Sequence, residues 1–475
     1  MIKKQLLRAA AFVLLAAMML GLIGSALCRP ASAMSALYNE PEDSLDVIVV
    51  GGSHVNSGVV PAILWDEYGI SAHNVFGWDQ TIWVGYHFIK ETFRTQSPQV
   101  VVVDLYGMCY NNSIEPARKV DELNYDNNYL LRPGLNQLEL WLSAALVGED
   151  RRNPLSFLPM VRFHSRWKNA GAAFQEELDT LPVAAHTKGF SVLGQVSPHT
   201  RVEWDPALPA AAPYEGCERY LNKIVDYVQA QGAQLVFTML PYECQPTEPA
   251  IFNWLQQYAD SHSIPFLNYC GPMADEIGLD YSRHLADFEH LNHYGAQLVT
   301  RHLGDYLAGH YSFPAREAHH NLAQLDADAQ KTLRLLAVND MPDNLTDFAA
   351  WCSQHPGTRV FVSASKNTYI SPEVAAMLQP LGLAGFGEGQ AYYAVWADGT
   401  AEQALGSEAK RLDLTIGQFE IALDGEGNIA ANDRLIRQGS GVQIMLYDDL
   451  LEKPTFHTDV HPMTGALNWA DCYFA

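Results

Sequence analysis

Short apolar runs alternate with amphipathic stretches along the first two thirds of the chain. The runs are rich in β-branched residues, which is typical of buried strands, at residues 45–50, 71–76, 100–105, 234–240 and 264–267. The stretches between them have apolar positions at helical spacing, at residues 59–68, 82–93, 217–230, 251–261 and 295–307. Strands that alternate with helices favour a parallel sheet with helices on both faces. The expected fold class is therefore α/β, with a doubly wound parallel sheet.

Two stretches break this rhythm and define the expected domain organisation. Residues 133–213 are irregular and partly helical, which predicts a helical insertion that covers one edge of the sheet. Residues 311–330 are polar and rich in alanine, and we expect a linker there. Beyond it, apolar runs bounded by glycine-rich turns predict a second, smaller, mostly β domain at 331–475. Its predicted strands are residues 360–363, 391–396, 419–423 and 442–447.

The first 34 residues have the pattern of a membrane-targeting segment. Basic residues, the last of them Arg8, precede an almost purely apolar run at 9–28. About 20 apolar residues span a hydrocarbon core, and positive residues before the run favour a cytoplasmic N-terminus. We therefore expect a single-pass cell-membrane anchor with the remaining domains outside the cytoplasm. The alternative is a signal peptide cleaved after Ala31-Ser32-Ala33, followed by secretion.

Length, charge and cysteine content exclude several classes of function. A chain of 475 residues exceeds a single core, which fits two folded domains of unequal size, with 45–310 the larger. Its 30 basic and 54 acidic residues give a net charge of −24, which repels nucleic acid. The seven cysteines include no CxxC pair, so no zinc or thioredoxin-like motif is present, and their pairing stays open. We expect neither a metal nor another cofactor.

Candidate chemistry begins at the end of the first predicted strand, in the turn Gly51-Gly52-Ser53-His54. A serine at the carboxyl end of a parallel strand lies where such sheets form their ligand crevices. Alone, this serine is more typical of a turn or a helix cap. As a nucleophile it would need a base, and that base would need a carboxylate to hold its tautomer. Asp287 and His290, just before the last predicted helix, are the residue types for those roles. We expect His54 to pack beside the turn.

The first turn and the block Asp287-Phe288-Glu289-His290-Leu291-Asn292-His293-Tyr294-Gly295-Ala296 together resemble the first and last blocks of SGNH/GDSL-type hydrolases. That resemblance implies a flavodoxin-like three-layer domain at roughly 45–310. It also implies Ser53 as the nucleophile, His290 as the base and Asp287 as the acid that orients it.

The two middle blocks depart from the family pattern. Residues 74–83 resemble the second block, which implies Gly77 as an oxyanion-hole donor, but Asp79 stands where a second small residue is expected. A carboxylate there would repel a developing oxyanion unless it pointed away or was paired. The third-block asparagine is missing, because Asn111 and Asn112 are out of register. Asp104 is more typical of a structural hydrogen-bond acceptor.

The resemblance is closest to exported SGNH-like proteins of the bacterial cell envelope, including alginate O-acetyltransferase-like and D-alanyl-lipoteichoic acid biosynthesis proteins. It implies a serine esterase or O-acyltransferase acting on an envelope polysaccharide or glycan, with a membrane-bound O-acyltransferase as a partner. Residues 419–425 and 442–448 resemble the interleukin-like EMT inducer domain, which implies a glycan-holding module. The alternative function is a catalytically inactive SGNH-fold scaffold that binds glycan.

Overall fold

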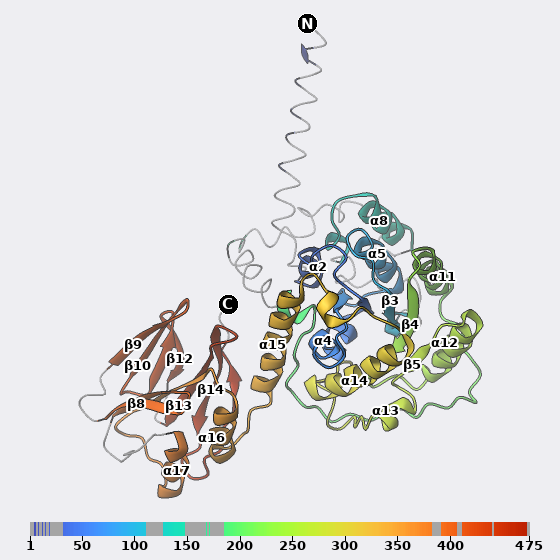
Figure 1. Ribbon diagram of the computed structural model, residues 1–475. Helices are drawn as coiled ribbons and strands as arrows, with labels where there is room; N and C mark the ends of the chain where they lie inside the picture. Colours follow the sequence, from blue (N-terminus) through green and yellow to red (C-terminus); the bar gives the residue numbers. More distant parts are fainter. Residues whose placement is uncertain are drawn as a thin grey trace. The chain divides into compact units, whose positions relative to one another are not determined.

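The computed structural model describes residues 32–110, 127–147, 185–381, 391–405, 411–438 and 441–472, with isolated positions in 4–19 and 168–171. Within the chain there are two compact units, and the boundary between them falls between Leu333 and Arg334 (Figure 1). The first unit is mixed α/β and the second is mostly antiparallel β. This division confirms the mixed α/β class predicted from the sequence.

Five parallel strands form the centre of the first unit. They are β1 (Val47–Gly51), β2 (Ala72–Phe76), β3 (Val100–Asp104), β4 (Gln234–Met239) and β5 (Phe266–Asn268). Their order in the sheet is β2-β1-β3-β4-β5, and every neighbouring pair is parallel. This is the order of a flavodoxin-like doubly wound sheet, whose topological switch point lies between β1 and β3. Each predicted strand of this domain overlaps an observed one.

The strands of this sheet are buried on both faces. Ile48 and Val50 belong to a core shared with the first helical layer, whereas Val47 and Val49 belong to a core shared with the second. The first layer includes α5 (Ile82–Thr92), α11 (Glu215–Ala230) and α12 (Pro249–His262), and the second includes α4 (Pro61–Tyr68) and α14 (His293–His310). Because successive residues of a strand point to opposite faces, continuous apolar strands are what such a three-layer fold requires.

Two helices follow β1 where the sequence pattern predicted one. Helix α3 (Ser53–Gly58) begins directly at the turn, and α4 begins after a short extended break. Pro61 occupies the first turn of α4, where its missing N–H costs nothing, and it cannot continue α3 because it has no N–H to donate. The side chain of Asn74 donates to the carbonyls of Val55 (3.1 Å) and Val59 (2.8 Å), which fixes α3 against β2.

The described part of the predicted insertion covers β2, the edge strand nearest the turn. The N–H of Asn74 donates to the carbonyl of Lys188 (2.9 Å), so the inserted segment continues the hydrogen bonding of the sheet. The buried Lys188 ammonium lies 2.7 Å from both the Glu40 and the Asp328 carboxylates. Elsewhere in the insertion, helix α8 (Leu135–Val147) packs against α5.

The stretch expected to be a linker contains the start of a long helix, α15 (Leu322–Asn339). Leu325 and Ala329, one turn apart, are buried, and Trp65 donates a hydrogen bond to Asp326 (2.8 Å). The first half of α15 is therefore part of the α/β unit. The five alanines and the polar residues of this stretch make its narrow apolar stripe hard to recognise from the sequence.

Two antiparallel sheets and short helices make up the second unit. The larger sheet has the order β15-β14-β13-β6-β7-β8 and the smaller β12-β11-β10-β9. Their strands are β6 (Thr358–Ala364), β7 (Tyr392–Ala397), β8 (Thr400–Leu405), β9 (Arg411–Ile416), β10 (Phe419–Asp424), β11 (Asn428–Ala431), β12 (Arg434–Gln438), β13 (Val442–Asp448), β14 (Lys453–Val460) and β15 (Ala470–Asp471). The helices α16 (Leu345–Gln354) and α17 (Pro372–Met377) share a core with the larger sheet, and Phe361 packs in a second core with Ile421.

The N-terminal anchor prediction lies largely outside the described residues, because most of 9–28 belongs to the undescribed part. Among the residues that are described, no helix combines the length and the apolar character needed to cross a bilayer.

Candidate functional site

Ser53 occupies the point where β1 ends and α3 begins, beside the switch point of the sheet. The sharp turn before it depends on Gly51. A Cβ at that position would lie 2.5 Å from Val55 Cγ2 and 2.9 Å from Asp104 Cβ, so no other residue fits without displacement. As the first residue of α3, Ser53 has an N–H with no partner inside the helix.

The structure brings the three predicted catalytic residues into one hydrogen-bonded chain. His290 Nε2 lies 2.8 Å from Ser53 Oγ, and His290 Nδ1 lies 2.9 Å from both carboxylate oxygens of Asp287. When Nδ1 carries the proton, the imidazole donates to Asp287 and Nε2 accepts the hydrogen bond of the serine hydroxyl. This geometry is the one that a serine nucleophile with a histidine base requires.

The loop that carries Asp287 and His290 is held by its own hydrogen bonds. Asp287 Oδ1 accepts the backbone N–H groups of Glu289 (2.8 Å) and His290 (2.9 Å). Partial burial raises the pKa of Asp287, but the hydrogen bonds from the His290 ring and from these two N–H groups together outweigh it. The net pKa is lowered, so Asp287 remains a carboxylate that fixes the tautomer of His290.

The same loop leads directly into α14. Asn292 caps that helix by accepting the N–H groups of Tyr294 and Gly295, both at 3.1 Å. A Cβ on Gly295 would come within 2.4 Å of the His284 carbonyl oxygen, so the close approach of the loop to α14 requires glycine. These contacts explain the Leu-Asn and Gly-Ala residues that follow the histidine in the sequence.

His54 packs beside the turn and near the His290 ring, as its sequence position predicted. Its imidazole stacks on Tyr106 with a centroid distance of 3.8 Å, and its centroid is 5.7 Å from that of His290. Burial, with a smaller effect of the nearby His290, lowers the pKa of His54 well below its ordinary value. His54 is thus a neutral packing partner of the site, and it does not bond to Ser53.

The predicted oxyanion loop packs against the nucleophile turn. A Cβ on Gly52 would lie 3.6 Å from Gln80 N and 3.9 Å from Gly77 O, so the two loops are in van der Waals reach. Gly77 is buried, whereas Asp79 is half-buried and adopts a left-handed backbone conformation with φ of 46°. Aspartate tolerates that conformation better than most residues. Both predicted oxyanion residues therefore belong to the wall beside Ser53.

Asn127, which the sequence did not single out, anchors this oxyanion loop. Its side chain accepts the Trp78 N–H (3.1 Å) and donates to the Trp78 carbonyl (2.7 Å). A Cβ on Gly77 would come within 2.6 to 2.8 Å of the same amide, so glycine is needed for the approach. The Trp78 N–H is thereby occupied by a side chain and is not available to a ligand. No motif spacing marks Asn127, and Asn111 and Asn112 lie outside the described residues.

Asp104 lies behind the nucleophile turn and takes no part in the hydrogen-bonded chain. It is buried, and it accepts the N–H of Leu240 at 2.9 Å, which joins the ends of β3 and β4. Burial raises its pKa to about 7, against the opposing effect of that hydrogen bond. The expected structural role of Asp104 agrees with these contacts.

Residues suited to hold a metal do not gather in the part of the chain that the structure describes. Within it, no group of three or more His, Cys, Asp or Glu side chains is placed around a common point. The described cysteines are free thiols: Cys109, Cys217, Cys244, Cys270, Cys352 and Cys472.

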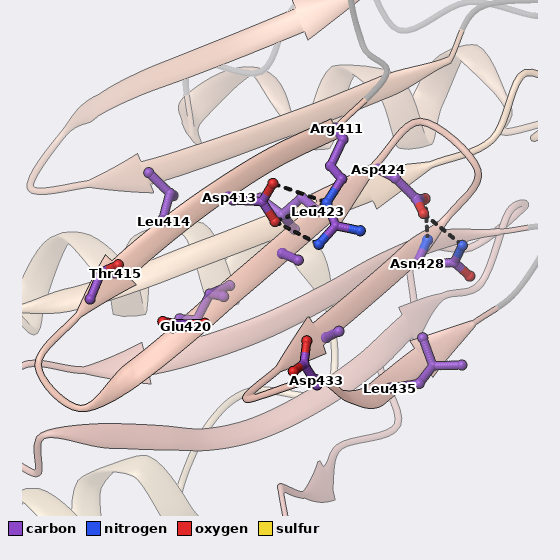
Figure 2. A pocket seen from close by; sticks show the side chains of 13 residues that line it. Arg411, Asp413, Leu414, Thr415, Glu420, Leu423, Asp424, Asn428, Asp433 and Leu435 are labelled. Atoms are coloured by element: carbon purple, nitrogen blue, oxygen red, sulfur yellow. Dashed lines mark hydrogen bonds and ion pairs between the residues drawn. The ribbon is translucent and has the colours of Figure 1, made fainter.

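The second unit carries a hollow of about 560 Å³ on the outer face of its smaller sheet, here called the C-terminal hollow (Figure 2). Its polar lining includes Arg411, Asp413, Glu420, Asp424, Asn428 and Asp433. Arg411 Nε donates to both carboxylate oxygens of Asp413 (2.9 and 3.0 Å), and Asn428 Nδ2 donates to Asp424 (2.8 Å). Many of these polar groups are therefore satisfied by each other.

The chain matches no model of a known protein family and no curated protein. The functional argument therefore depends on the residues and geometry of the serine site itself.

Proposed function

We propose that this chain is an exported serine esterase or O-acyltransferase of the SGNH type, which acts on a cell-envelope glycan through an acyl-serine intermediate at Ser53. The observation that carries the proposal is the continuous chain of hydrogen bonds from Asp287 through His290 to Ser53 Oγ. Its position at the switch point of a doubly wound sheet agrees with where such folds bind ligands.

In the first half of the reaction, His290 Nε2 takes the hydroxyl proton of Ser53 as Oγ attacks the acyl carbonyl carbon. The carbonyl electron pair moves onto oxygen, and the N–H groups of Ser53 and Gly77 stabilise that charge. Collapse re-forms the carbonyl and breaks the bond to the leaving alcohol, which receives the proton from His290. Asp287 stabilises the imidazolium throughout.

In the second half, a hydroxyl compound gives its proton to His290 and attacks the acyl-serine. The bond to Ser53 Oγ breaks, and Oγ recovers the proton. Water as the acceptor gives an esterase, whereas a sugar hydroxyl gives a transferase, and the same residues serve both. The proposal includes a membrane-bound O-acyltransferase as the acyl-supplying partner, and the C-terminal unit as a glycan-holding module.

The N-terminal segment gives the proposed location. Its basic residues and apolar run support a single-pass anchor that places both folded units outside the cytoplasm, with secretion after cleavage as the second form of export. Met34 and Leu37 of helix α2 (Ser32–Tyr38) are buried in the core of the first unit. Experiments should therefore use the full chain.

The test is acetyl-ester turnover by the full-length protein, together with labelling by a fluorophosphonate probe and mapping of the modified peptide. We expect the native protein to hydrolyse a chromogenic acetyl ester and to be labelled at Ser53. Ser53→Ala should lose both, whereas Ser57→Ala, one turn further along α3, should keep both.

Equal background turnover and no labelling of either protein would contradict the enzyme proposal. The remaining alternative would then be the inactive glycan-binding scaffold. The 2.8 Å separation of Ser53 Oγ and His290 Nε2 does not favour that alternative, because no packed side chain lies between the two groups.

A further inference from the structure

Exposed aromatic side chains of the first unit gather around the serine site. In the described part of residues 32–333, the Phe, Tyr and Trp side chains that are more than about a third exposed are Trp78 (44%), Phe288 (55%) and Tyr294 (37%). Trp78 follows Gly77 in the oxyanion loop, and Phe288 lies between Asp287 and His290. Large aromatic side chains left exposed beside a reactive group mark a surface that binds something.

The charged groups on the same loops are all acidic. Residues 77–82, 241–246 and 286–294 contain four carboxylates and neither lysine nor arginine: Asp79, Glu243, Asp287 and Glu289. Glu243 is tied to the catalytic loop, because its N–H donates to the Phe288 carbonyl (2.8 Å), and its carboxylate lies 2.7 Å from His199 Nδ1. Glu289 accepts the hydroxyl of Tyr106 (3.1 Å). The exposed aromatic side chains and the carboxylates thus lie on the same loops, which contain neither lysine nor arginine.

We propose that Trp78 and Phe288 form a stacking platform for an uncharged sugar ring, an inference that rests on the proposed function and specifies its substrate class. The C–H face of a pyranose packs on an aromatic ring, while its hydroxyls donate hydrogen bonds to neighbouring carboxylates. Both kinds of group are present on the two loops that flank Ser53. The substrate is therefore a neutral glycan.

The same surface disfavours two other substrates. A uronate or phosphate polymer would bring its negative charges against four carboxylates with no lysine or arginine on these loops to offset them. A long aliphatic chain would cover those carboxylates without offering them a hydrogen bond, which leaves polar groups buried and unpaired. A sugar ring can stack on the aromatic side chains and donate hydrogen bonds to the carboxylates of Asp79, Glu243 and Glu289, while Asp287 stays bonded to His290.

The test is equilibrium binding, measured by calorimetry with full-length Ser53→Ala protein. The probes are a panel of neutral hexose oligomers five sugars long and an oligouronate of equal length. We expect at least one neutral oligomer to bind about tenfold more tightly than the oligouronate, which corresponds to roughly 1.4 kcal/mol. Trp78→Ala and Phe288→Ala, added singly, should each weaken that binding about tenfold, because stacking energy is lost.

The matched control is Tyr306→Ala, which removes a half-buried aromatic side chain about 20 Å along α14 from its first residue and should leave binding unchanged. Three results would overturn the platform: no neutral oligomer binds, the oligouronate binds at least as tightly, or both aromatic variants bind like the parent. Since Ser53→Ala protein has no nucleophile, this result is independent of ester turnover. Glycan binding with neither ester turnover nor Ser53 labelling of the native protein would overturn the enzyme proposal alone.

Discussion

The serine site and the C-terminal hollow differ in how their polar groups are used. In the hollow, Arg411 and Asp413 pair with each other on an exposed sheet face, and little hydrogen-bonding capacity in that pair is directed at a ligand. In the serine site, Asp287 orients His290, and His290 is hydrogen-bonded to Ser53 Oγ, the proposed nucleophile. The hydrogen-bonded chain at Ser53 is therefore a stronger indication of a functional site than the volume of about 560 Å³ of the C-terminal hollow.

Burial separates the two regions as well. Polar groups removed from water lie behind the serine site, among them His54 and Asp104. Burial lowers the pKa of His54 and raises the pKa of Asp104, and both shifts favour the neutral form. On the hollow, the hydrogen bond from Arg411 lowers the pKa of Asp413 and favours its charged form. The first region is preorganised at a cost in stability, whereas the second is an ordinary solvated surface.

The largest effect that distinguishes the regions is expected from Asp287→Asn. The amide N–H of the asparagine donates to His290 Nδ1, so the ring proton moves to Nε2. In that tautomer Nε2 cannot accept the proton of Ser53. We expect kcat for an acetyl ester to fall about 10³-fold with little change in KM. Steady-state kinetics with Asp413→Asn as the control should show no loss. An equal loss of kcat in Asp287→Asn and Asp413→Asn would contradict a specific role of the serine site in turnover.

A second effect concerns stability and has opposite pH dependence in the two regions. The pKa of Asp104 is about 7 in the folded chain, so between pH 4 and pH 7 the unfolded chain loses its proton first. The free energy of unfolding should therefore fall by about 3 kcal/mol over this range because of this one group. In Asp104→Asn that fall disappears, because the amide does not ionise and still accepts the Leu240 N–H.

Urea unfolding of the native protein and of Asp104→Asn at pH 4, 5.5 and 7 measures this difference, and parallel curves would contradict it. Asp413→Asn supplies the opposite case. The pKa of Asp413 is lowered by the Arg411 hydrogen bond, so its contribution is present above its unfolded pKa of about 3.9 and is lost as the pH falls through the folded value. The free energy of unfolding of Asp413→Asn should therefore be lower than that of the native protein at neutral pH, and the two values should become equal in acid.

The smallest effect sharpens the role of the oxyanion loop. Asn127→Ala removes both hydrogen bonds to the Trp78 backbone and frees the neighbouring Gly77 N–H to move. We expect kcat to fall about tenfold while KM changes less, because a misplaced donor weakens stabilisation of the transition state more than substrate binding. Thermal unfolding run in parallel separates this loss from unfolding. A variant with native kcat would show that Asn127 only packs.

Much of the first unit was predictable because its strands are buried on both faces. A continuous apolar run such as 100–105 predicts a buried strand from the local sequence alone. The split between α3 and α4 was missed because Ser53 to Gly58 has no helical apolar stripe, and tertiary bonds from Asn74 hold it instead. The strands β8, β9, β11, β12, β14 and β15 were missed. Most of them have two to six residues and few apolar positions, and the eight-residue β14 contains no continuous apolar run.

The candidate site divides in the same way. Ser53, Asp287 and His290 were singled out because the two short blocks that contain them resemble the first and last blocks of SGNH/GDSL-type hydrolases, and because their residue types suit a nucleophile, a base and an orienting acid. Asn127 was not, because it reaches Trp78 across 49 residues of chain, a contact that only the folded structure specifies. Short sequence blocks therefore pointed to the candidate catalytic residues, whereas long-range packing determines the contacts that support them.

The two ion pairs of Lys188 also determine when the first unit can finish folding during synthesis. Its ammonium joins Glu40, near the start of the first unit, to Asp328, which is made roughly 290 residues later. Lys188 follows Glu40 by 148 residues and precedes Asp328 by 140, so at about 5–20 residues per second Lys188 has only the first of its two carboxylate partners for on the order of 10 to 30 seconds. Until Asp328 is synthesised, the buried Lys188 ammonium pairs with Glu40 alone. The first unit therefore completes this ion-pair network only after α15 has been made.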